Sequence, residues 1–233
     1  MSQLRIFSYL PNPRIWKATI AARLCGVEVE VRGSSPRELQ SWLWDFDARP
    51  LSSDEPGASA EVRVGKVGIF ESNSIMRAVA RLGESRFPLY GRGPYEASRV
   101  DSFLDASLVF ARDAQIYLLA LMSERVSPEI HSRARDGFAI YAAGIDQALA
   151  SEHAFLVGSE VTLADICFVA EMSLFFNERA RVGALEQQSL DPILHAKVEA
   201  EFPRAMGHLA RLRKHPAFAP DVDPYLAKLG IRT

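Results

Sequence analysis

Few cysteines, little net charge and no long uncharged stretch mark this sequence, and each absence excludes a class of protein. The 233 residues contain two cysteines, Cys25 and Cys167, which are far apart and lack the spacing of a zinc site. Two thiols are too few for the disulfide framework of a small secreted protein. No window of about 18 residues is free of charge, so we expect no membrane span. With no signal-peptide pattern at the N-terminus, the sequence predicts a soluble cytoplasmic protein.

The charged residues nearly balance, with 27 basic and 29 acidic side chains and a formal net charge of −2. Nucleic-acid binding needs a basic excess, so nucleic acid is not an expected partner. The five histidines are scattered without metal-ligand spacing, so we expect no metal site and a surface or interface position for all of them. Hydrophobic residues at 48 % and charged residues at 24 % are typical of a globular chain.

The N-terminal part of the chain alternates between strand and helix patterns. Residues 14–25 are predicted to be a helix because apolar side chains recur on one face, and Gly26 follows where a helix cap is expected. Val27, Val29 and Val31 alternate with charged residues, the pattern of a half-buried strand. The expected order is a strand at 4–9, a helix at 14–25, a strand at 27–31, a helix at 36–46, a loop at 48–60, a β-hairpin at 61–70 and a helix at 72–82.

From about residue 94 onwards almost no strand pattern remains. Helices are expected at 94–122, 128–150, 162–181, 191–213 and 222–229. The sequence therefore predicts two domains: an α/β domain over residues 1–85 and an all-helical domain over residues 94–233, joined by a linker at 86–93.

Two short motifs stand at the beginning of two expected helices. Residues 71–75 read Glu-Ser-Asn-Ser-Ile, where the last strand of the first domain meets its last helix. Residues 161–166 read Val-Thr-Leu-Ala-Asp-Ile and open a helix of the second domain. Together with the domain order, these motifs resemble the cytosolic glutathione transferase superfamily. In finer detail the chain is most similar to the transferase-like domain of elongation factor 1 gamma and related proteins.

The resemblance implies a thioredoxin-like α/β N-terminal domain that binds glutathione and an all-α C-terminal domain with a hydrophobic co-substrate site. It also implies glutathione as co-substrate, a small electrophile as second substrate, a role in detoxification and a homodimer. The implied reaction is attack of the glutathione thiolate on an electrophilic, apolar molecule. Two alternatives stay open: a binding or scaffold module without turnover, and a glutathione-dependent ether-cleaving or dehalogenating enzyme.

Glu71 and Ser72 stand where a helix begins. The first helical N–H groups are unpaired there and the helix dipole is positive, so an anion is favoured. The resemblance implies that Ser72 binds the γ-glutamyl carboxylate of glutathione and that Glu71 pairs with the γ-glutamyl ammonium group. The alternative is that Ser72 only caps the helix, since serine is a preferred N-cap residue.

Several residues near the end of the first strand are candidates for activating the glutathione thiol. By the resemblance, the tyrosine-type position falls on Ser8, next to Tyr9, and the serine- or cysteine-type position falls on Asn12. An asparagine amide can donate to a thiolate, and the guanidinium of Arg14 can stabilise one. Asn12 cannot form a mixed disulfide, which disfavours a glutaredoxin-like mechanism. The alternatives are a packed aromatic for Tyr9, a turn residue for Asn12 and a solvated helix start for Arg14.

Two further features of the family are sought in the sequence. A cis-proline whose backbone pairs with the cysteinyl part of glutathione could be Pro50 or Pro56, both in the expected loop. For the co-substrate pocket, the resemblance points to Phe110 and Arg112 on the aromatic-rich helix at 94–122. The alternative for that helix is a purely structural role in the core.

The remaining motif is structural. Thr162 and Asp165 have the spacing of a capping box, in which the two side chains satisfy the first N–H groups of a helix. Cys25 and Cys167 are expected to be small buried side chains, and neither stands where the family carries a catalytic thiol.

Overall fold

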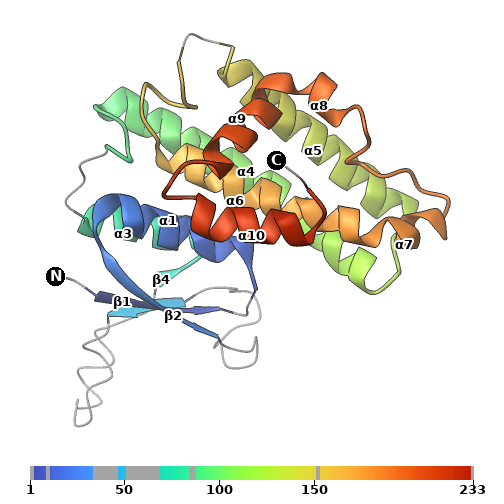
Figure 1. Cartoon of the computed structure of the whole chain (residues 1–233), viewed down its shortest axis with the longest axis horizontal. Helices are drawn as coiled ribbons and strands as arrows, with labels where there is room; N and C mark the ends of the chain where they lie inside the picture. Colours follow the sequence, from blue (N-terminus) through green and yellow to red (C-terminus); the bar gives the residue numbers. More distant parts are fainter. Residues whose placement is uncertain are drawn as a thin grey trace. The chain divides into compact units, whose positions relative to one another are not determined.

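The computed structural model describes residues 3–8, 11–33, 47–50, 69–83, 88–150 and 153–231. The chain divides into two compact units, unit 1 at residues 1–89 and unit 2 at residues 90–233. Unit 1 contains a sheet with helices, and the described part of unit 2 is helical (Figure 1). The expected α/β region followed by an all-α region is confirmed in this outline. Within the described ranges, no helix combines the length and the apolar character needed to cross a membrane.

Unit 1 is built on a four-stranded sheet in the order β2-β1-β3-β4. Its elements are β1 (Gln3–Ser8), the 3-10 helix η1 (Pro13–Ile15), α1 (Trp16–Cys25), β2 (Glu28–Gly33), β3 (Asp47–Pro50), β4 (Ile69–Phe70) and α3 (Ser72–Leu82). β1 and β2 pair in parallel, with α1 as the crossover between them, while β3 pairs antiparallel with both β1 and β4. The expected helix at 36–46 and the first strand of the expected hairpin lie outside the described residues.

Strand β3 lies in a segment that the sequence predicted as a loop, so the prediction for residues 48–50 was wrong. Asp47 faces Phe7 of β1 across the ladder, and Pro50 faces Leu4. Pairing with β1 satisfies backbone groups of this segment, which outweighs the low strand propensity of Asp and Pro. Pro50 stands at the last described position of β3, where a missing N–H is tolerated.

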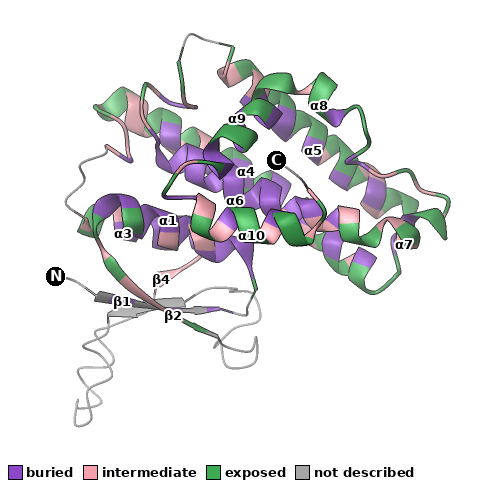
Figure 2. Ribbon diagram, in the orientation of Figure 1, coloured by how far each residue is buried: buried purple, intermediate pink, exposed green. Residues whose placement is uncertain are grey.

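The core of unit 1 lies between the sheet and the helices α1 and α3, which cover the same face (Figures 1 and 2). Its innermost apolar side chains, each 0–1 % exposed, include Ile6, Ile20, Ile75, Met76 and Val79. They come from β1 and from both helices, so the apolar faces predicted by periodicity meet here.

Two glycines shape the packing of α1 and α3. Gly26 ends α1 with a left-handed φ of 68°, as the sequence predicted for a helix cap. Gly83 follows α3, and a Cβ placed there would lie 2.2 Å from the Cβ of Cys25. The two helices therefore approach so closely at Gly83 that no other residue fits without a shift.

Unit 2 is a set of helices around α6. Its elements are α4 (Pro94–Met122), α5 (Pro128–Ala148), α6 (Leu163–Phe175), the 3-10 helix η3 (Phe176–Arg181), α7 (Val182–Glu186), α8 (Val198–Glu201), α9 (Pro203–Arg213) and α10 (Ala219–Lys228). α6 is buried along nearly its whole length, with α4 and α10 packed against it (Figure 2). Its mainly apolar sequence is typical of a helix covered on all sides.

Two of the expected helices of unit 2 are interrupted. The segment predicted as one helix at 191–213 is not helical over 191–197, and the rest forms α8 and α9, because Pro203 cannot donate an N–H to a continuing helix and instead opens α9. The helix predicted over 162–181 is α-helical to Phe175 and then tightens into η3. The helix expected at 94–122 is α4 with the same bounds.

The capping box of α6 is confirmed. Asp165 Oδ2 accepts hydrogen bonds from the backbone N–H of Thr162 at 2.8 Å and from the Thr162 hydroxyl at 2.9 Å. Its other oxygen, Oδ1, accepts from the backbone N–H of Leu156 at 3.0 Å and lies 2.7 Å from Nε2 of His208. Asp165 is fully buried, so these hydrogen bonds are what makes its burial possible.

Two of the histidines expected at the surface or at an interface, His131 and His208, are instead buried within unit 2, where they are 8 % and 3 % exposed. Each has a ring nitrogen held by a protein oxygen: His208 by the buried carboxylate of Asp165, and His131 by the backbone carbonyl oxygen of Asp191 at 2.8 Å. A histidine with a partner at its ring nitrogen can be buried at low cost, and sequence spacing gives no sign of such a partner.

Candidate functional site

The chain passes from β1 of unit 1 into η1 through Asn12. Asn12 is the N-cap residue of η1, with the extended backbone (φ −139°, ψ 112°) favoured before a proline. Its Oδ1 accepts a hydrogen bond from the backbone N–H of Arg14 at 3.0 Å. Asn12 is thus a turn and cap residue through its oxygen, as one interpretation of the sequence predicted.

The amide nitrogen of Asn12 is in a different situation. Asn12 is 4 % exposed, and its Nδ2 is buried without a hydrogen-bond partner in the described part of the chain. The N–H of Arg14 needs an oxygen, so the amide orientation is set and the NH₂ group lies on the other side. Leaving such a donor unpaired costs about 1–3 kcal/mol. A buried donor without an acceptor marks a position where a ligand atom can supply one.

Two other candidate residues of unit 1, Ser8 and Arg14, are buried. Ser8, the last residue of β1, is 0 % exposed, and Arg14 is 6 % exposed. The interpretation of Arg14 as a solvated helix-start residue is therefore wrong. Tyr9 and Pro56 lie outside the described residues, and Pro50 stands at the end of β3.

Strand β4 passes into α3 at Glu71, whose backbone has φ 69° and ψ 128°. A positive φ is uncommon for a residue other than glycine, and residues in such strained conformations cluster at functional sites. Glu71 occupies the N-cap position without a side-chain cap, and Ser72 is the first helical residue, 6 % exposed. The alternative in which Ser72 serves only as the N-cap is therefore wrong. The helix start keeps its tendency to bind an anion.

Lys17 on α1 also reaches the beginning of α3, and sequence reasoning missed it. Its ammonium nitrogen Nζ lies 2.7 Å from Oδ1 of Asn73 and 3.2 Å from Oγ of Ser72, and Lys17 is 1 % exposed. One signal was available: Lys17 has the helical spacing of Ile20, Ala21 and Leu24, which are all buried. A lysine on the buried face of a helix is a marker of a polar site in the core.

The electrostatics of unit 1 therefore differ from those of the whole chain. Two cationic side chains of unit 1 are buried: Arg14 in η1, and Lys17, which contacts the start of α3. The positive end of the α3 dipole adds to them. This arrangement favours an anionic ligand, although the formal net charge of the chain is −2.

The two residues predicted for a co-substrate pocket lie on α4 in unit 2. Phe110 is 2 % exposed, stacks on Tyr141 with ring centroids 4.8 Å apart, and meets the edge of Phe175 at 5.3 Å. Its position agrees with the alternative of a core residue. Arg112 has a side chain that is 67 % exposed, and its guanidinium lies 3.7 Å from Asp113.

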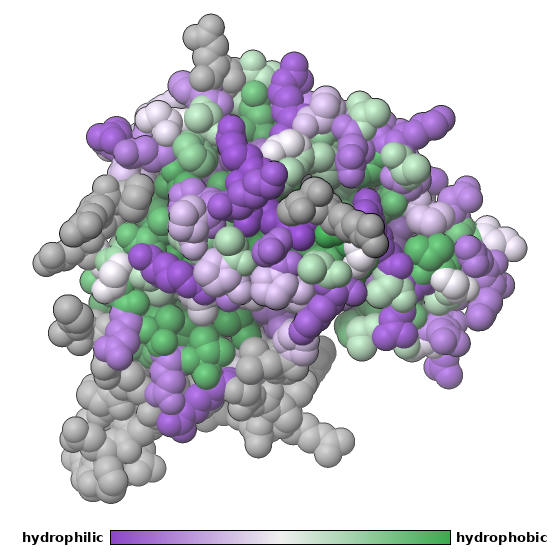
Figure 3. Space-filling view, in the orientation of Figure 1, coloured by the Kyte–Doolittle hydropathy of each residue, from purple (hydrophilic) through white to green (hydrophobic). Residues whose placement is uncertain are grey.

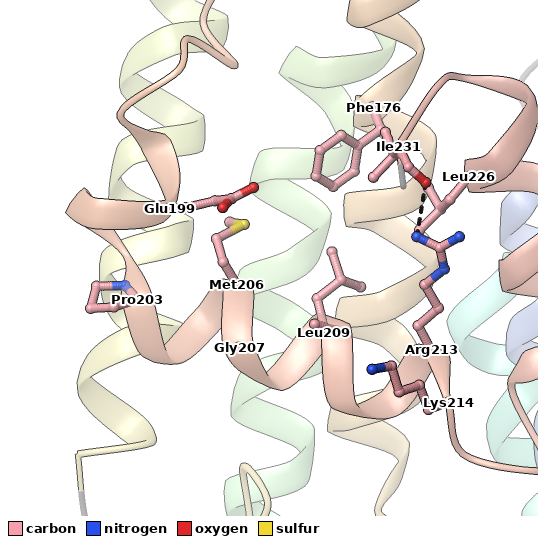
Figure 4. Close-up of a pocket in the computed structure, with 11 residues that line it drawn as sticks. Phe176, Glu199, Pro203, Met206, Gly207, Leu209, Arg213, Lys214, Leu226 and Ile231 are labelled. Carbon is pink, nitrogen blue, oxygen red and sulfur yellow. Dashed lines mark hydrogen bonds between the residues drawn. The ribbon is translucent and has the colours of Figure 1, made fainter. Parts of the chain in front are cut away.

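A cavity of about 430 Å³ lies elsewhere in unit 2, beside α9 and α10 (Figure 4). Apolar side chains such as Met206, Leu209 and Leu226 line it, and Arg213 at one end donates to the carbonyl oxygen of Ile231 at 3.0 Å. Neither Phe110 nor Arg112 lines it. In the space-filling view, hydrophilic side chains lie over much of the visible face of unit 2 (Figure 3).

The two cysteines do not take part in a site. Both are buried, as expected, and neither forms a disulfide; burial raises the pKa of the Cys25 thiol to about 11. A thiol with so high a pKa is a poor nucleophile at neutral pH. Across the described ranges, no three His, Cys, Asp or Glu side chains form a group that could hold a metal ion.

Comparison with known proteins adds three similarities. The chain is 34 % identical over 158 residues to elongation factor 1-gamma of Trypanosoma cruzi, covering 66 % of the chain and 36 % of that protein. It is 26 % identical over 175 residues to the glutathione S-transferase-like protein LUC7 of a Fusarium species, covering 70 % of the chain and 73 % of that protein. The glutathione transferase URE2P6 of Phanerochaete chrysosporium, solved with oxidized glutathione, matches with a TM-score of 0.69 at 18 % identity and covers 98 % of both chains.

These similarities differ in how much of the compared protein they cover. The match to the elongation factor spans little more than a third of that protein's length, whereas the structural match spans nearly all of both chains. No protein-family model matches the chain.

Proposed function

Because this chain has the fold of the glutathione transferase superfamily, the family that its motifs resemble, we propose that it is a glutathione transferase. In this function unit 1 is a thioredoxin-like domain that binds glutathione, and unit 2 provides the site for an apolar co-substrate. The glutathione thiol releases its proton to water, and the thiolate attacks an electrophilic carbon. A carbon–sulfur bond forms as the leaving group departs. The expected role is detoxification of such electrophiles in the cytoplasm.

The buried amide of Asn12 is the single observation that carries this proposal. Its Nδ2 is a donor without an acceptor in the described residues, and its orientation is set through Oδ1 by Arg14. A thiolate placed at Nδ2 would complete the hydrogen bonding of the amide. Since the hydrogen bond favours the charged form of the sulfur, the pKa of the bound thiol falls.

The other candidate residues bind the γ-glutamyl end of glutathione or stabilise the thiolate. Ser72 and Glu71, at the start of α3, hold the carboxylate and the ammonium group of the γ-glutamyl end. Arg14 adds positive charge that stabilises the thiolate or a ligand carboxylate. Ser8, the last residue of β1, and Tyr9, which follows it in the sequence, remain candidates for a second donor to the sulfur.

Calorimetric titration with glutathione, followed by a conjugation assay with a generic aryl halide, tests the function. We expect glutathione to bind and the conjugate to form faster than in the uncatalysed mixture. No binding at millimolar glutathione would exclude this function. It would also exclude the glutathione-dependent cleavage of ethers or carbon–halogen bonds, which needs the same thiolate.

Replacement of Asn12 by aspartate tests the role of its amide. In Asn12→Asp the side chain keeps an oxygen for the N–H of Arg14 but loses the NH₂ donor, so the start of η1 is preserved. We expect the pKa of the bound glutathione thiol to rise, as followed by thiolate absorbance against pH, and in Asn12→Ala as well. An unchanged titration in both variants would show that Asn12 is not the activating residue.

The second candidate function is a binding or scaffold module, and the similarity to elongation factor 1-gamma favours it. Such a module can keep the glutathione site without a complete catalytic arrangement. Binding of glutathione without any conjugation, over a panel of aryl halides, epoxides and unsaturated carbonyl compounds, would favour the module over the enzyme.

Self-association is part of the proposal, with a homodimer as the expected state. α4 carries five apolar side chains that are 44–63 % exposed: Leu108, Val109, Ile116, Leu119 and Met122. Their spacing places them on one side of the helix, around Arg112. A cluster of exposed apolar side chains on one face of a helix is typical of a surface that a second protein chain covers.

A further inference from the structure

The beginning of α3 contains one group that the proposed function has not used, the ammonium group of Lys17. It comes from α1 and contacts the first two residues of α3, at 3.2 Å from Ser72 Oγ and 2.7 Å from Asn73 Oδ1. Lys17 is 1 % exposed, so its charge acts in surroundings with little water. Screening by solvent is weak in such a place, and the field of the charge on its neighbours is strong.

The direction of the hydrogen bond to Ser72 follows from the chemistry of the two groups. A lysine ammonium has donors and no acceptor, so the Ser72 oxygen accepts. The hydroxyl hydrogen of Ser72 is then directed away from Lys17 and remains available to donate. A hydroxyl held in this way is prepared for an acceptor, and the positive charge behind it makes an anionic acceptor the preferred one.

We propose that Lys17 is a positioning residue of the glutathione site: it orients the Ser72 hydroxyl and provides the positive charge that favours the α-carboxylate of the γ-glutamyl residue. The inference rests on the proposed function, because it concerns the same ligand. It adds a residue from α1 to a subsite otherwise made by the turn into α3. It also predicts that this subsite selects ligands by the presence of that carboxylate.

The test compares two ligands that differ in one group. Glutathione and 4-aminobutanoyl-cysteinylglycine are identical except that the second lacks the α-carboxylate of the γ-glutamyl residue. Calorimetric titration of both ligands is carried out on the wild-type protein and on the variant Lys17→Met, with Lys17→Gln as a second variant. Arg23→Met, on an exposed position of the same helix, is the control for loss of one positive charge.

We expect the wild-type protein and Arg23→Met to bind glutathione about tenfold or more tightly than the analogue, since a charge-assisted hydrogen bond is lost with the carboxylate. In both Lys17 variants we expect glutathione to bind about tenfold more weakly and the preference over the analogue to disappear. Circular dichroism and thermal unfolding identify which variants are folded.

Three results would overturn the inference while leaving the proposed function intact. The first is a wild-type protein that binds both ligands equally. The second is a folded Lys17 variant that keeps the full preference for glutathione. The third is an equal loss of affinity for both ligands, which would make Lys17 a support of the fold only. A wild-type protein that binds neither ligand would instead reject the proposed function, and the inference with it.

Discussion

Glu178, in η3 of unit 2, is a buried carboxyl group with an incomplete set of hydrogen bonds. It is 0 % exposed, and its Oε1 accepts from the backbone N–H of Leu194 at 3.0 Å. Its Oε2 and the Tyr117 hydroxyl have no hydrogen bond of good geometry among the described residues, but the two groups are close enough for each to shift the pKa of the other. Burial raises the pKa of Glu178 to about 7, although the N–H of Leu194 acts in the opposite direction. The carboxyl group therefore titrates near neutral pH.

This raised pKa predicts that Glu178 makes the protein less stable as the pH rises. The contribution of Glu178 to the free energy of unfolding is fully present below its ordinary pKa of 4.5. It is lost as the pH rises to about 7. The loss amounts to at most about 3 kcal/mol. In Glu178→Gln, which keeps an oxygen for Leu194 but does not titrate, we expect a smaller fall in the free energy of unfolding between pH 5 and pH 7.5 than in the wild type.

Urea unfolding at several pH values measures this difference. Glu186→Gln serves as the control because Glu186 is exposed on α7. Identical pH dependence in the wild type and in Glu178→Gln would contradict the prediction.

At the scale of elements, Asp165 connects the start of α6 to two other segments of unit 2. It binds the N–H of Leu156, which precedes the helix in sequence, and His208 of α9. Arg211 lies 2.6 Å from Nδ1 of His208 and donates to it, so Nε2 carries the hydrogen that is donated to Asp165. A capping box that local sequence predicted as an isolated feature is therefore part of a buried network.

The network predicts a larger effect of Asp165→Ala than the loss of a helix cap alone. A cap contributes about 1 kcal/mol. Removal of Asp165 also leaves buried donors of Leu156, Thr162 and His208 unpaired, so we expect a loss of about 3 kcal/mol or more. Chemical denaturation measures both this variant and Ser127→Ala, the control. Ser127 caps α5 at an exposed position through one bond to Ile130.

We expect the control to lose about 1 kcal/mol. A similar, small loss in both variants would mean that the network around Asp165 adds nothing to the cap.

At the scale of the whole molecule, the exposed apolar cluster of α4 predicts that the chain associates with a second copy. Placing a charge in the cluster opposes burial of that surface, because a buried unpaired charge is costly. In Leu119→Glu, a position that is 56 % exposed in the described structure, we expect the dimer to weaken while the helical content is unchanged.

Sedimentation velocity over a range of concentrations follows this change. Leu82→Glu is the matched control, since Leu82 is 45 % exposed at the end of α3 in unit 1. A Leu119→Glu variant with the same sedimentation as the wild type, or a wild type that is monomeric throughout, would argue against α4 as the contact surface.

Sequence reasoning could predict much of the fold and part of the candidate site. Helices such as α4 were predicted to the residue, because apolar periodicity and a proline at the start are local signals. β3 was missed, since its pairing with β1 is a contact between distant segments. For the same reason the burial of His208 was missed, as its partner Asp165 lies 43 residues away.

The sequence by itself determined the two-part order of elements and the caps of α1 and α6, because each depends on neighbours within a few positions. The resemblance carried by its motifs pointed to Asn12, Arg14 and Ser72 as candidates. The tertiary structure decided that the Asn12 amide has a donor with no partner among the described residues, that Glu71 is held at positive φ, and that Lys17 contacts Ser72 across 55 residues. These facts concern hydrogen bonds and conformations that form only when separate segments pack together. The chemistry proposed for the site depends on them.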